Sequence, residues 1–168
     1  LFSDNRGYFL ESYNLSRYVD AGIKEEFVQD NISFSSAAKT IRGLHAQKTP
    51  YGQSKLVSVL SGKIWDVVVD IRPDKPSFGS WLGVTLCSEK REQLYIPEGF
   101  LHGFVTLVPD VVIFYKCGSP YDKNSEIGVV YNDAELNIPW PIESEQPTIS
   151  DKDIELGSFF DLKRDIGI

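Results

Sequence analysis

Two histidines, His45 and His102, are the only imidazoles in this sequence of 168 residues, so the search for a general base is short. The ordinary pKa of imidazole, about 6.5, suits a group that takes and returns a proton near neutral pH. His45 closes the run Ile41-Arg42-Gly43-Leu44-His45, and Lys55 opens the next apolar segment. The stretch therefore combines a candidate base with two cations. A structural histidine with a hydrogen-bond partner is the alternative.

Residues 41–47 are predicted to form a β-strand that carries the candidate base. Strict alternation would place Ile41, Gly43 and His45 on one face of this strand, and Arg42 and Leu44 on the other. Arg42 and His45 can share a pocket only if the alternation breaks. Gly43 is the residue that would permit a β-bulge between them.

A second candidate polar group is Asp66, which lies between Trp65 and Val67 in a strand predicted over residues 63–72. A carboxylate near a sheet interior needs a partner to offset its lost hydration. We predict that the 55–60 and 63–72 strands pair as a β-hairpin across Ser61-Gly62. Lys55, on the paired strand, is then the expected partner of Asp66.

The remaining elements are also short strands, separated by turns rich in glycine and proline. Strands are predicted over residues 5–13, 27–34, 81–86, 93–96, 100–107, 111–117 and 126–131, with short helices over 14–24 and from Ser150. Asn14 and Ser150 are suitable helix N-caps. This pattern predicts an all-β fold, a jelly-roll barrel formed by one domain over residues 1–168, with a pocket in the barrel mouth.

Composition limits the partners. The net charge of −7 argues against nucleic-acid binding, and no apolar run approaches the roughly 20 residues needed to cross a bilayer. A few local cations can still bind a small anion. Cys87 and Cys117 have no zinc-site spacing, which favours a reduced, cytoplasmic setting. The sequence contains no methionine, so we expect it to begin inside a longer chain that supplies a further N-terminal strand.

The segment Pro97-Glu98-Gly99-Phe100-Leu101-His102 resembles the second motif of cupins, P-x-G-x-x-H. Cupins are jelly rolls that often hold a metal with three histidines and a glutamate. The H-x-H of the first cupin motif is missing, because Ala46 and Gln47 follow His45. The resemblance is therefore to a cupin barrel without its metal, and we expect no metal and no cofactor.

A closer resemblance runs in order along nearly the whole chain. Residues 4–12, 27–31, 41–45, 53–57, 66–72, 96–104, 115–116 and 150–153 resemble the dTDP-4-dehydrorhamnose 3,5-epimerase family. In its reaction the C4 ketone of a dTDP-linked keto-deoxysugar acidifies the hydrogens at C3 and C5. The resemblance implies that His45 is the base, that Asp153 orients the imidazole and stabilises its cation, and that Tyr115 returns the proton from the opposite face.

The resemblance also implies how the substrate is held. Lys55 would contact the enolate oxygen with support from Asp66 and His102, and Tyr121 would stack on thymine. The other implied substrate-binding residues are Arg6, Glu11, Gln29, Asn31, Arg42, Glu126 and Lys152. A homodimer is expected on the same ground. Ala46, Tyr51-Gly52 and Cys117-Gly118-Ser119 depart from common family residues beside the pocket, so the sugar that is accepted stays open.

Three other functions remain compatible with the sequence. The first is an epimerase acting on C3 or C5 alone of another dTDP-keto sugar, with the same acid–base pair. The second is a non-catalytic cupin that binds a nucleotide sugar, against which the joint presence of His45, Tyr115 and Lys55 argues. The third is a metal-dependent cupin oxygenase, which would contain bound iron.

Overall fold

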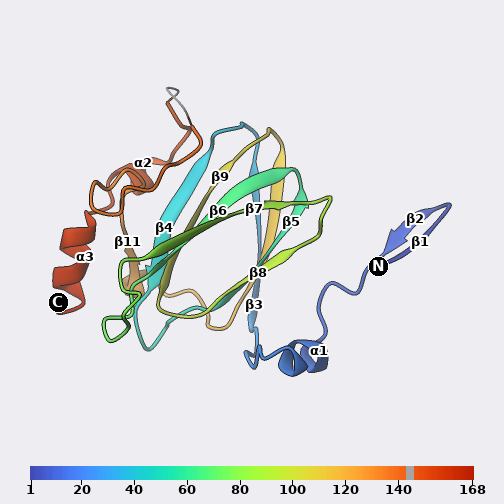
Figure 1. Cartoon of the computed structure of the whole chain (residues 1–168), viewed down its shortest axis with the longest axis horizontal. Helices are drawn as coiled ribbons and strands as arrows, with labels where there is room; N and C mark the ends of the chain where they lie inside the picture. The colour runs from blue at the N-terminus through green and yellow to red at the C-terminus, as the bar shows by residue number, and fades with distance from the viewer. Residues whose placement is uncertain (143–145) are drawn as a thin grey trace.

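Two antiparallel sheets form a barrel in the computed structural model, which describes residues 1–142 and 146–168 (Figure 1). One sheet has the order β3 (Gln29–Ser35), β10 (Val111–Cys117), β5 (Lys55–Ser61), β8 (Gln93–Ile96). The other has the order β11 (Glu126–Gly128), β4 (Ile41–Gln47), β9 (Phe100–Thr106), β6 (Lys63–Asp70), β7 (Trp81–Cys87). The predicted all-β jelly roll is confirmed.

The central strands of the five-stranded sheet, β4, β9 and β6, are largely buried on both faces, which explains why they are apolar on both sides. Towards the barrel interior the sheet contributes Ile64, Val68 and Phe104 to a cluster with Val57 and Ile113 of the other sheet. Towards the outside, a second cluster joins its remaining apolar residues to the C-terminal part of the chain; it includes Val67, Val69, Leu101, Val105, Trp140, Phe159 and Leu162. Successive residues of β6 therefore pack on opposite faces of the sheet, with Ile64 and Val68 towards the interior and Val67 and Val69 towards the outside.

Among the described residues, the helices are α1 (Leu15–Asp20), α2 (Asp151–Ile154), α3 (Phe159–Asp165) and a short 3-10 helix, η1 (Lys123–Ser125). The predicted N-caps are confirmed, because the Asn14 and Ser150 side chains accept hydrogen bonds from helical amides. Helix α3 was not predicted from the sequence. It begins with a capping box between Ser158 and Asp161. In the described part of the chain, no helix has the length and apolar character that crossing a membrane would require.

The predicted hairpin between residues 55–60 and 63–72 is wrong. β5 pairs with β10 and β8, whereas β6 pairs with β9 and β7. The chain passes from one sheet to the other at Gly62, whose φ of +84° places an added Cβ 2.8 Å from Val111 Cγ2. In the sequence, a link of one glycine resembles a hairpin turn. In the structure, however, the two strands that it joins belong to different sheets. Lys55 and Asp66 thus approach the interior from opposite sheets.

The strand predicted over residues 5–13 is also shorter than expected. The segment forms a small hairpin of β1 (Phe2–Asp4) and β2 (Gly7–Phe9) that stands out from the barrel (Figure 1). The face of the Tyr8 ring contacts the body of the protein: Arg91 Cζ lies over the ring, 4.1 Å from its centroid. Phe2 and Phe9 remain 74% and 68% exposed. We call residues 1–10 the N-terminal arm.

At the end of β6, Asp70 fixes the loop that follows the strand. Its carboxylate accepts hydrogen bonds from the Arg72 side chain (2.9 Å) and from Ser77 Oγ (2.7 Å). The Arg72 hydrogen bond, supported by Ser77, lowers the pKa of Asp70 to about 2. A carboxyl whose folded pKa is depressed stabilises the fold above its unfolded pKa of about 3.9, and that contribution is lost as the pH falls towards 2.

We predict that Asp70→Asn lowers the free energy of unfolding by about 2 kcal/mol at pH 7, and that its difference from the wild type shrinks below about pH 4. Urea unfolding at several pH values measures this. Asp74→Asn is the control, because Asp74 pairs with Lys75 at the exposed surface and its loss should hardly change the free energy of unfolding. An Asp70→Asn effect that is equal at pH 7 and pH 3 would contradict the assignment.

Candidate active site

A break in β4 brings two functional side chains into one cavity. Arg42 is opposite Phe104 of β9, but the register then shifts so that His45 is opposite His102. Gly43 lies in the break with φ +102°, and a Cβ there would be 2.5 Å from the His102 carbonyl oxygen. Arg42 and His45 both line the resulting cavity, as the bulge hypothesis required. Only glycine fits this approach of backbone to backbone.

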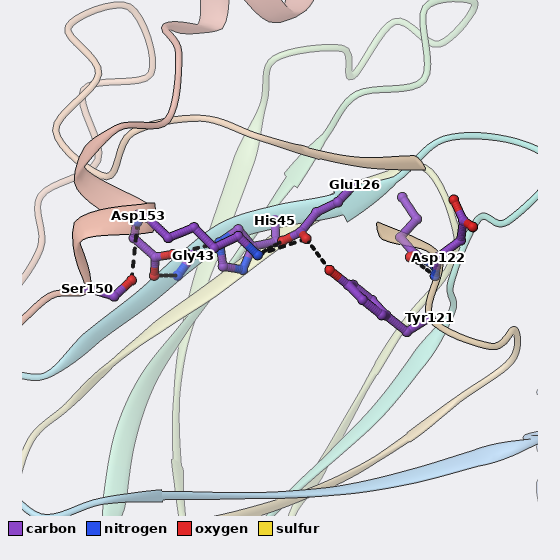
Figure 2. Close-up of polar contacts among 9 residues, drawn as sticks. Gly43, His45, Tyr121, Asp122, Glu126, Ser150 and Asp153 are labelled. Atoms are coloured by element: carbon purple, nitrogen blue, oxygen red, sulfur yellow. Dashed lines mark hydrogen bonds and ion pairs between the residues drawn. The ribbon is translucent and has the colours of Figure 1, made fainter. Parts of the chain in front are cut away.

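His45 is held by a carboxylate from the C-terminal part of the chain. Its Nε2 lies 2.9 Å from Asp153 Oδ1, and Asp153 Oδ2 accepts the Gly43 N–H at 3.0 Å (Figure 2). Burial alone would raise the pKa of Asp153, but the hydrogen bonds from His45 and Gly43 outweigh it and lower that pKa. Asp153 is therefore ionised at neutral pH and can stabilise an imidazolium. The pairing leaves Nδ1 as the His45 nitrogen available to a ligand.

Tyr115 and Lys55 come from the opposite wall. Tyr115 is on β10 and Lys55 on β5, in the four-stranded sheet, whereas His45 is on β4 in the five-stranded sheet. All three line the same cavity. Burial raises the pKa of Tyr115, so its phenol is protonated at neutral pH and can donate a proton. A flat ring bound between the walls would meet His45 on one face and Tyr115 on the other.

Asp66 and His102 form a buried pair beneath this cavity. His102 Nε2 lies 2.8 Å from Asp66 Oδ1, and Asp66 is fully buried. The expectation that Asp66 needs a partner is confirmed, but its hydrogen-bond partner is His102 rather than Lys55. Lys55 interacts with Asp66 electrostatically. Burial lowers the pKa of Lys55, and the negative charges of Asp66 and Glu126 oppose that change.

The cavity has two compartments. The inner compartment, of about 330 Å³, is lined by Ser33, Arg42, His102, Phe104 and Ile113. The outer compartment, of about 390 Å³, is lined by residues that include Gln29, Asn31, Gln47, Gln53, Tyr121 and Glu126. His45, Lys55, Tyr115 and Lys152 line both, so the candidate acid and base lie where the two compartments meet.

Glu126 organises the outer compartment. It accepts hydrogen bonds from Tyr121 O–H (2.6 Å) and from Lys152 Nζ (2.6 and 2.8 Å). In Figure 2 the residues follow one another from Ser150 and Asp153 past His45 to Glu126 and Tyr121. The Glu126 hydrogen bond raises the pKa of Lys152, which keeps that side chain cationic. The hydrogen bond from its hydroxyl to Glu126 thereby fixes the Tyr121 ring, which is exposed to solvent.

The barrel brings together nearly all of the predicted site residues, but Arg6 and Glu11 lie on or beside the N-terminal arm. Arg6 pairs with Asp4 of its own hairpin, and Glu11 pairs with Arg17 at 3.3 Å. Sequence reasoning missed Ser33, Phe104, Ile113 and Ser150 as lining residues. The signal for Ser33 and Ile113 was period-two alternation, since they share strand faces with Asn31 and Tyr115.

Within residues 1–142 and 146–168, no three His, Cys, Asp or Glu side chains come close enough together to hold a metal ion. The site contains a histidine–carboxylate pair, a tyrosine with a raised pKa and a half-buried lysine. Fold and site together define the class: a cupin-like barrel with an acid–base site in its interior.

Comparisons with known proteins narrow this class to a family. The sequence profile described as dTDP-4-dehydrorhamnose 3,5-epimerase matches residues 1–161. The enzyme of that name from Shigella flexneri is 46% identical over 162 residues, which cover 96% of this chain and 88% of the relative. The chain therefore belongs to the dTDP-4-dehydrorhamnose 3,5-epimerase family.

Solved structures agree with the sequence comparison. The Bacillus anthracis 3,5-epimerase with TDP and PPi bound is 48% identical, with a TM-score of 0.90 over 94% of this chain and 89% of that one. The Legionella pneumophila epimerase in complex with dTDP-4-keto-L-rhamnose is 44% identical, with a TM-score of 0.88 over 94% and 82%.

We predict that Gly43→Ala destabilises the protein by about 3 kcal/mol or more, because the methyl group adds a backbone clash to an unfavourable φ. Gly22→Ala is the matched control. Gly22 also has a positive φ, +94°, but an added Cβ would meet no atom within 4 Å, so only about 1 kcal/mol should be lost. Urea unfolding measures both, and equal losses would show that the approach of Gly43 to His102 is not limiting.

Proposed function

We propose that this protein epimerises C3 and C5 of dTDP-4-dehydro-6-deoxy-D-glucose, giving dTDP-4-dehydro-L-rhamnose. The observation that carries the proposal is the placement of His45 and Tyr115 on opposite walls of one cavity. Epimerisation removes a proton from one face of a carbon and returns one to the other face. A base and an acid on opposing walls suit that change, provided that the sugar ring lies between them.

In the first step His45 takes the proton from the carbon beside the C4 ketone. The C–H electron pair forms a C=C bond, and the C=O π electrons move onto oxygen to give an enolate. Asp153 stabilises the imidazolium through the 2.9 Å contact. Lys55 stabilises the enolate oxygen as an ammonium group in a site that is poor in water, where one such contact contributes about 3–4 kcal/mol.

In the second step Tyr115 donates its phenolic proton to the opposite face of the same carbon, and the enolate collapses back to the ketone. Transfer of the His45 proton to solvent and uptake of a proton by Tyr115 reset the site. The sequence then repeats at the second carbon. Atoms and charge balance without a cofactor, because the reaction moves only protons.

The outer compartment is proposed to hold the nucleotide. Tyr121 offers an exposed aromatic face to thymine, and Gln29 and Asn31 offer amides to its polar edge. Lys152 lines both compartments and Arg42 lines the inner one, so the diphosphate that they bind would lie near the junction, and guanidinium binds phosphate oxygens in pairs. The ligands in the Bacillus and Legionella structures are of the same chemical class and support this assignment.

The test is a proton NMR time course with dTDP-4-dehydro-6-deoxy-D-glucose in deuterated water. We predict that both the C3 and the C5 proton signals disappear with the wild type. Loss of one signal would identify a single-carbon epimerase, and loss of neither, with dTDP still bound, a binding protein. His45→Ala should slow exchange at least about 100-fold while its Kd for dTDP changes little. Exchange at the wild-type rate would refute His45 as the base.

We also propose that the active form is a homodimer in which each N-terminal arm lies against the barrel of its partner. The arm exposes Leu1, Phe2 and Phe9, and the edge strand β3 exposes Ile32 and Phe34 on its outer face. Apolar surface of this kind is typical of subunit contacts. A partner's arm would bring Arg6 and Glu11 to a site that they do not reach in their own chain.

The free thiols of Cys87 and Cys117 favour a cytoplasmic location.

A mixing experiment tests the exchange of arms. Arg6→Ala and His45→Ala should each be nearly inactive as homodimers. Coexpressed, they should form mixed dimers in which one site combines an intact His45 with an intact Arg6, restoring about a quarter of wild-type activity overall. If each arm serves its own barrel, no mixed dimer contains a complete site and no activity returns. Sedimentation of the wild type as a monomer would contradict the homodimer itself.

A further inference from the structure

The loop between β10 and β11 carries Tyr121, the ring proposed to stack on the nucleotide base. Backbone hydrogen bonds at Gly118 N and at the Ser125 carbonyl oxygen hold the two ends of this loop. In the described part of the chain, however, no backbone–backbone hydrogen bond involves residues 119–121. The middle of the loop therefore depends on side chains for its position.

Glutamine side chains hold the middle of the loop. Gln53 Nε2 donates a hydrogen bond to the Ser119 carbonyl oxygen at 2.7 Å, and Gln29 Oε1 accepts the Tyr121 N–H at 3.0 Å. A side-chain amide suits this task because, like the peptide group, it is uncharged and carries both a donor and an acceptor. Gln29 begins β3 and Gln53 lies just before β5, so these two bonds connect the loop to the four-stranded sheet.

Gln47, the last residue of β4, makes the most hydrogen bonds to the loop. Its Oε1 accepts the Asp122 N–H at 2.7 Å, and its Nε2 donates to the Pro120 carbonyl oxygen at 3.3 Å. Nε2 also donates to the Tyr51 carbonyl oxygen at 2.8 Å, and the Gln47 side chain belongs to a residue that is only 7% exposed. One amide from the five-stranded sheet therefore binds the backbone immediately before and immediately after Tyr121.

The Tyr121 ring needs this support because it is 53% exposed. Figure 2 shows the ring extending to Glu126, to which its hydroxyl donates a hydrogen bond at 2.6 Å. That bond fixes the far end of the side chain, and the glutamines fix the backbone from which it projects. A ring that is already in place loses less conformational entropy when a ligand stacks on it.

We propose that Gln47 is a positioning residue, which acts through the backbone of Pro120 and Asp122 to hold the Tyr121 ring where it stacks on the nucleotide base. This inference rests on the proposed function. Gln47 need not contact the ligand in this role. Its contribution is preorganisation of the ring, which strengthens binding of the nucleotide and leaves the proton-transfer steps unchanged.

A double-mutant cycle with dTDP as the ligand, measured by calorimetry, tests the proposal. Tyr121→Ala should weaken the Kd for dTDP about 10-fold, because stacking on the base is lost. Gln47→Ala should weaken it about 3–10-fold, because the ring is no longer held. Added to Tyr121→Ala, the Gln47→Ala change should alter the Kd by less than about twofold, since no ring remains to be positioned.

A second variant and a control separate positioning from general damage to the fold. Gln53→Ala removes a single hydrogen bond to the loop, so it should show the same pattern with a smaller loss and with less risk to folding. Thr106→Val is the matched control. The buried Thr106 Oγ1 accepts the Thr40 N–H and donates to the Ala37 carbonyl oxygen, and Thr106 lines neither compartment. Its loss should lower the Tm and leave the Kd for dTDP unchanged.

Steady-state kinetics with dTDP-4-dehydro-6-deoxy-D-glucose provide an independent measurement. Gln47→Ala should raise KM and leave kcat within about twofold, because the loop that it releases does not contain His45 or Tyr115. A kcat that falls as much as kcat/KM would overturn the inference, because Gln47 would then act on the chemical step.

Three results of the binding experiment would also overturn the inference. They are an unchanged Kd in Gln47→Ala, a loss from Gln47→Ala that is equally large with and without the Tyr121 ring, and a Kd weakened as much by Thr106→Val. The second result would mean that Gln47 acts on the ligand itself. Failure of the proposed function is distinct, because the wild type would then not turn over the keto sugar, whereas the cycle is measured from dTDP binding alone.

Discussion

The hydrogen bond between His45 Nε2 and Asp153 Oδ1 connects parts of the protein that are far apart in sequence, and the arrangement of the site depends on it. Asp153 can reach β4 only because α2 places it there, with Ser150 capping the helix. It also accepts the Gly43 N–H, and so holds the break in the strand. One carboxylate therefore orients His45, the proposed base, and accepts the hydrogen bond of the irregular backbone beside it. Since the break also turns Arg42 into the cavity, the anion-binding group depends on the same feature.

Each carboxylate of the cavity has a hydrogen-bond partner in a partly buried space. Asp153 is hydrogen bonded to His45, Asp66 to His102, and Glu126 to Lys152. The Lys55 ammonium has no direct hydrogen-bond partner among the described residues. Burial lowers the pKa of Lys55, while nearby negative charges oppose that change. An enolate forming beside it would supply the missing anion. A cation that is more stable in the transition state than in the empty site contributes to rate rather than to binding. The local cations also explain how a protein with a net charge of −7 can bind a diphosphate.

Much of this could be predicted from the sequence, for physical reasons that differ between elements. The short apolar runs over residues 63–72 and 111–117 were predicted as strands, and both are strands of the barrel, because apolar segments of this length between turns suit a buried sheet. Gly43 signalled the break in β4, since only glycine tolerates the approach to His102. The hairpin across Gly62 was predicted wrongly, because a one-residue link does not reveal whether two strands pair or separate into facing sheets. Ser33 and Ile113 were not named, although alternation places them on the same strand faces as Asn31 and Tyr115 and so contained the signal that they line the cavity.

The central claim is that His45 and Tyr115 act on opposite faces of the sugar, and isotope exchange in Tyr115→Phe tests it most directly. With dTDP-4-dehydro-6-deoxy-D-glucose in deuterated water, this variant retains the base and lacks the opposing acid. In the recovered substrate we expect deuterium at the acidic carbon, with the configuration of that carbon retained. His45 would remove the proton, exchange it with the solvent and return a deuteron to the same face. Inverted product at the wild-type rate would show that Tyr115 is not the acid, and it would contradict the two-wall mechanism.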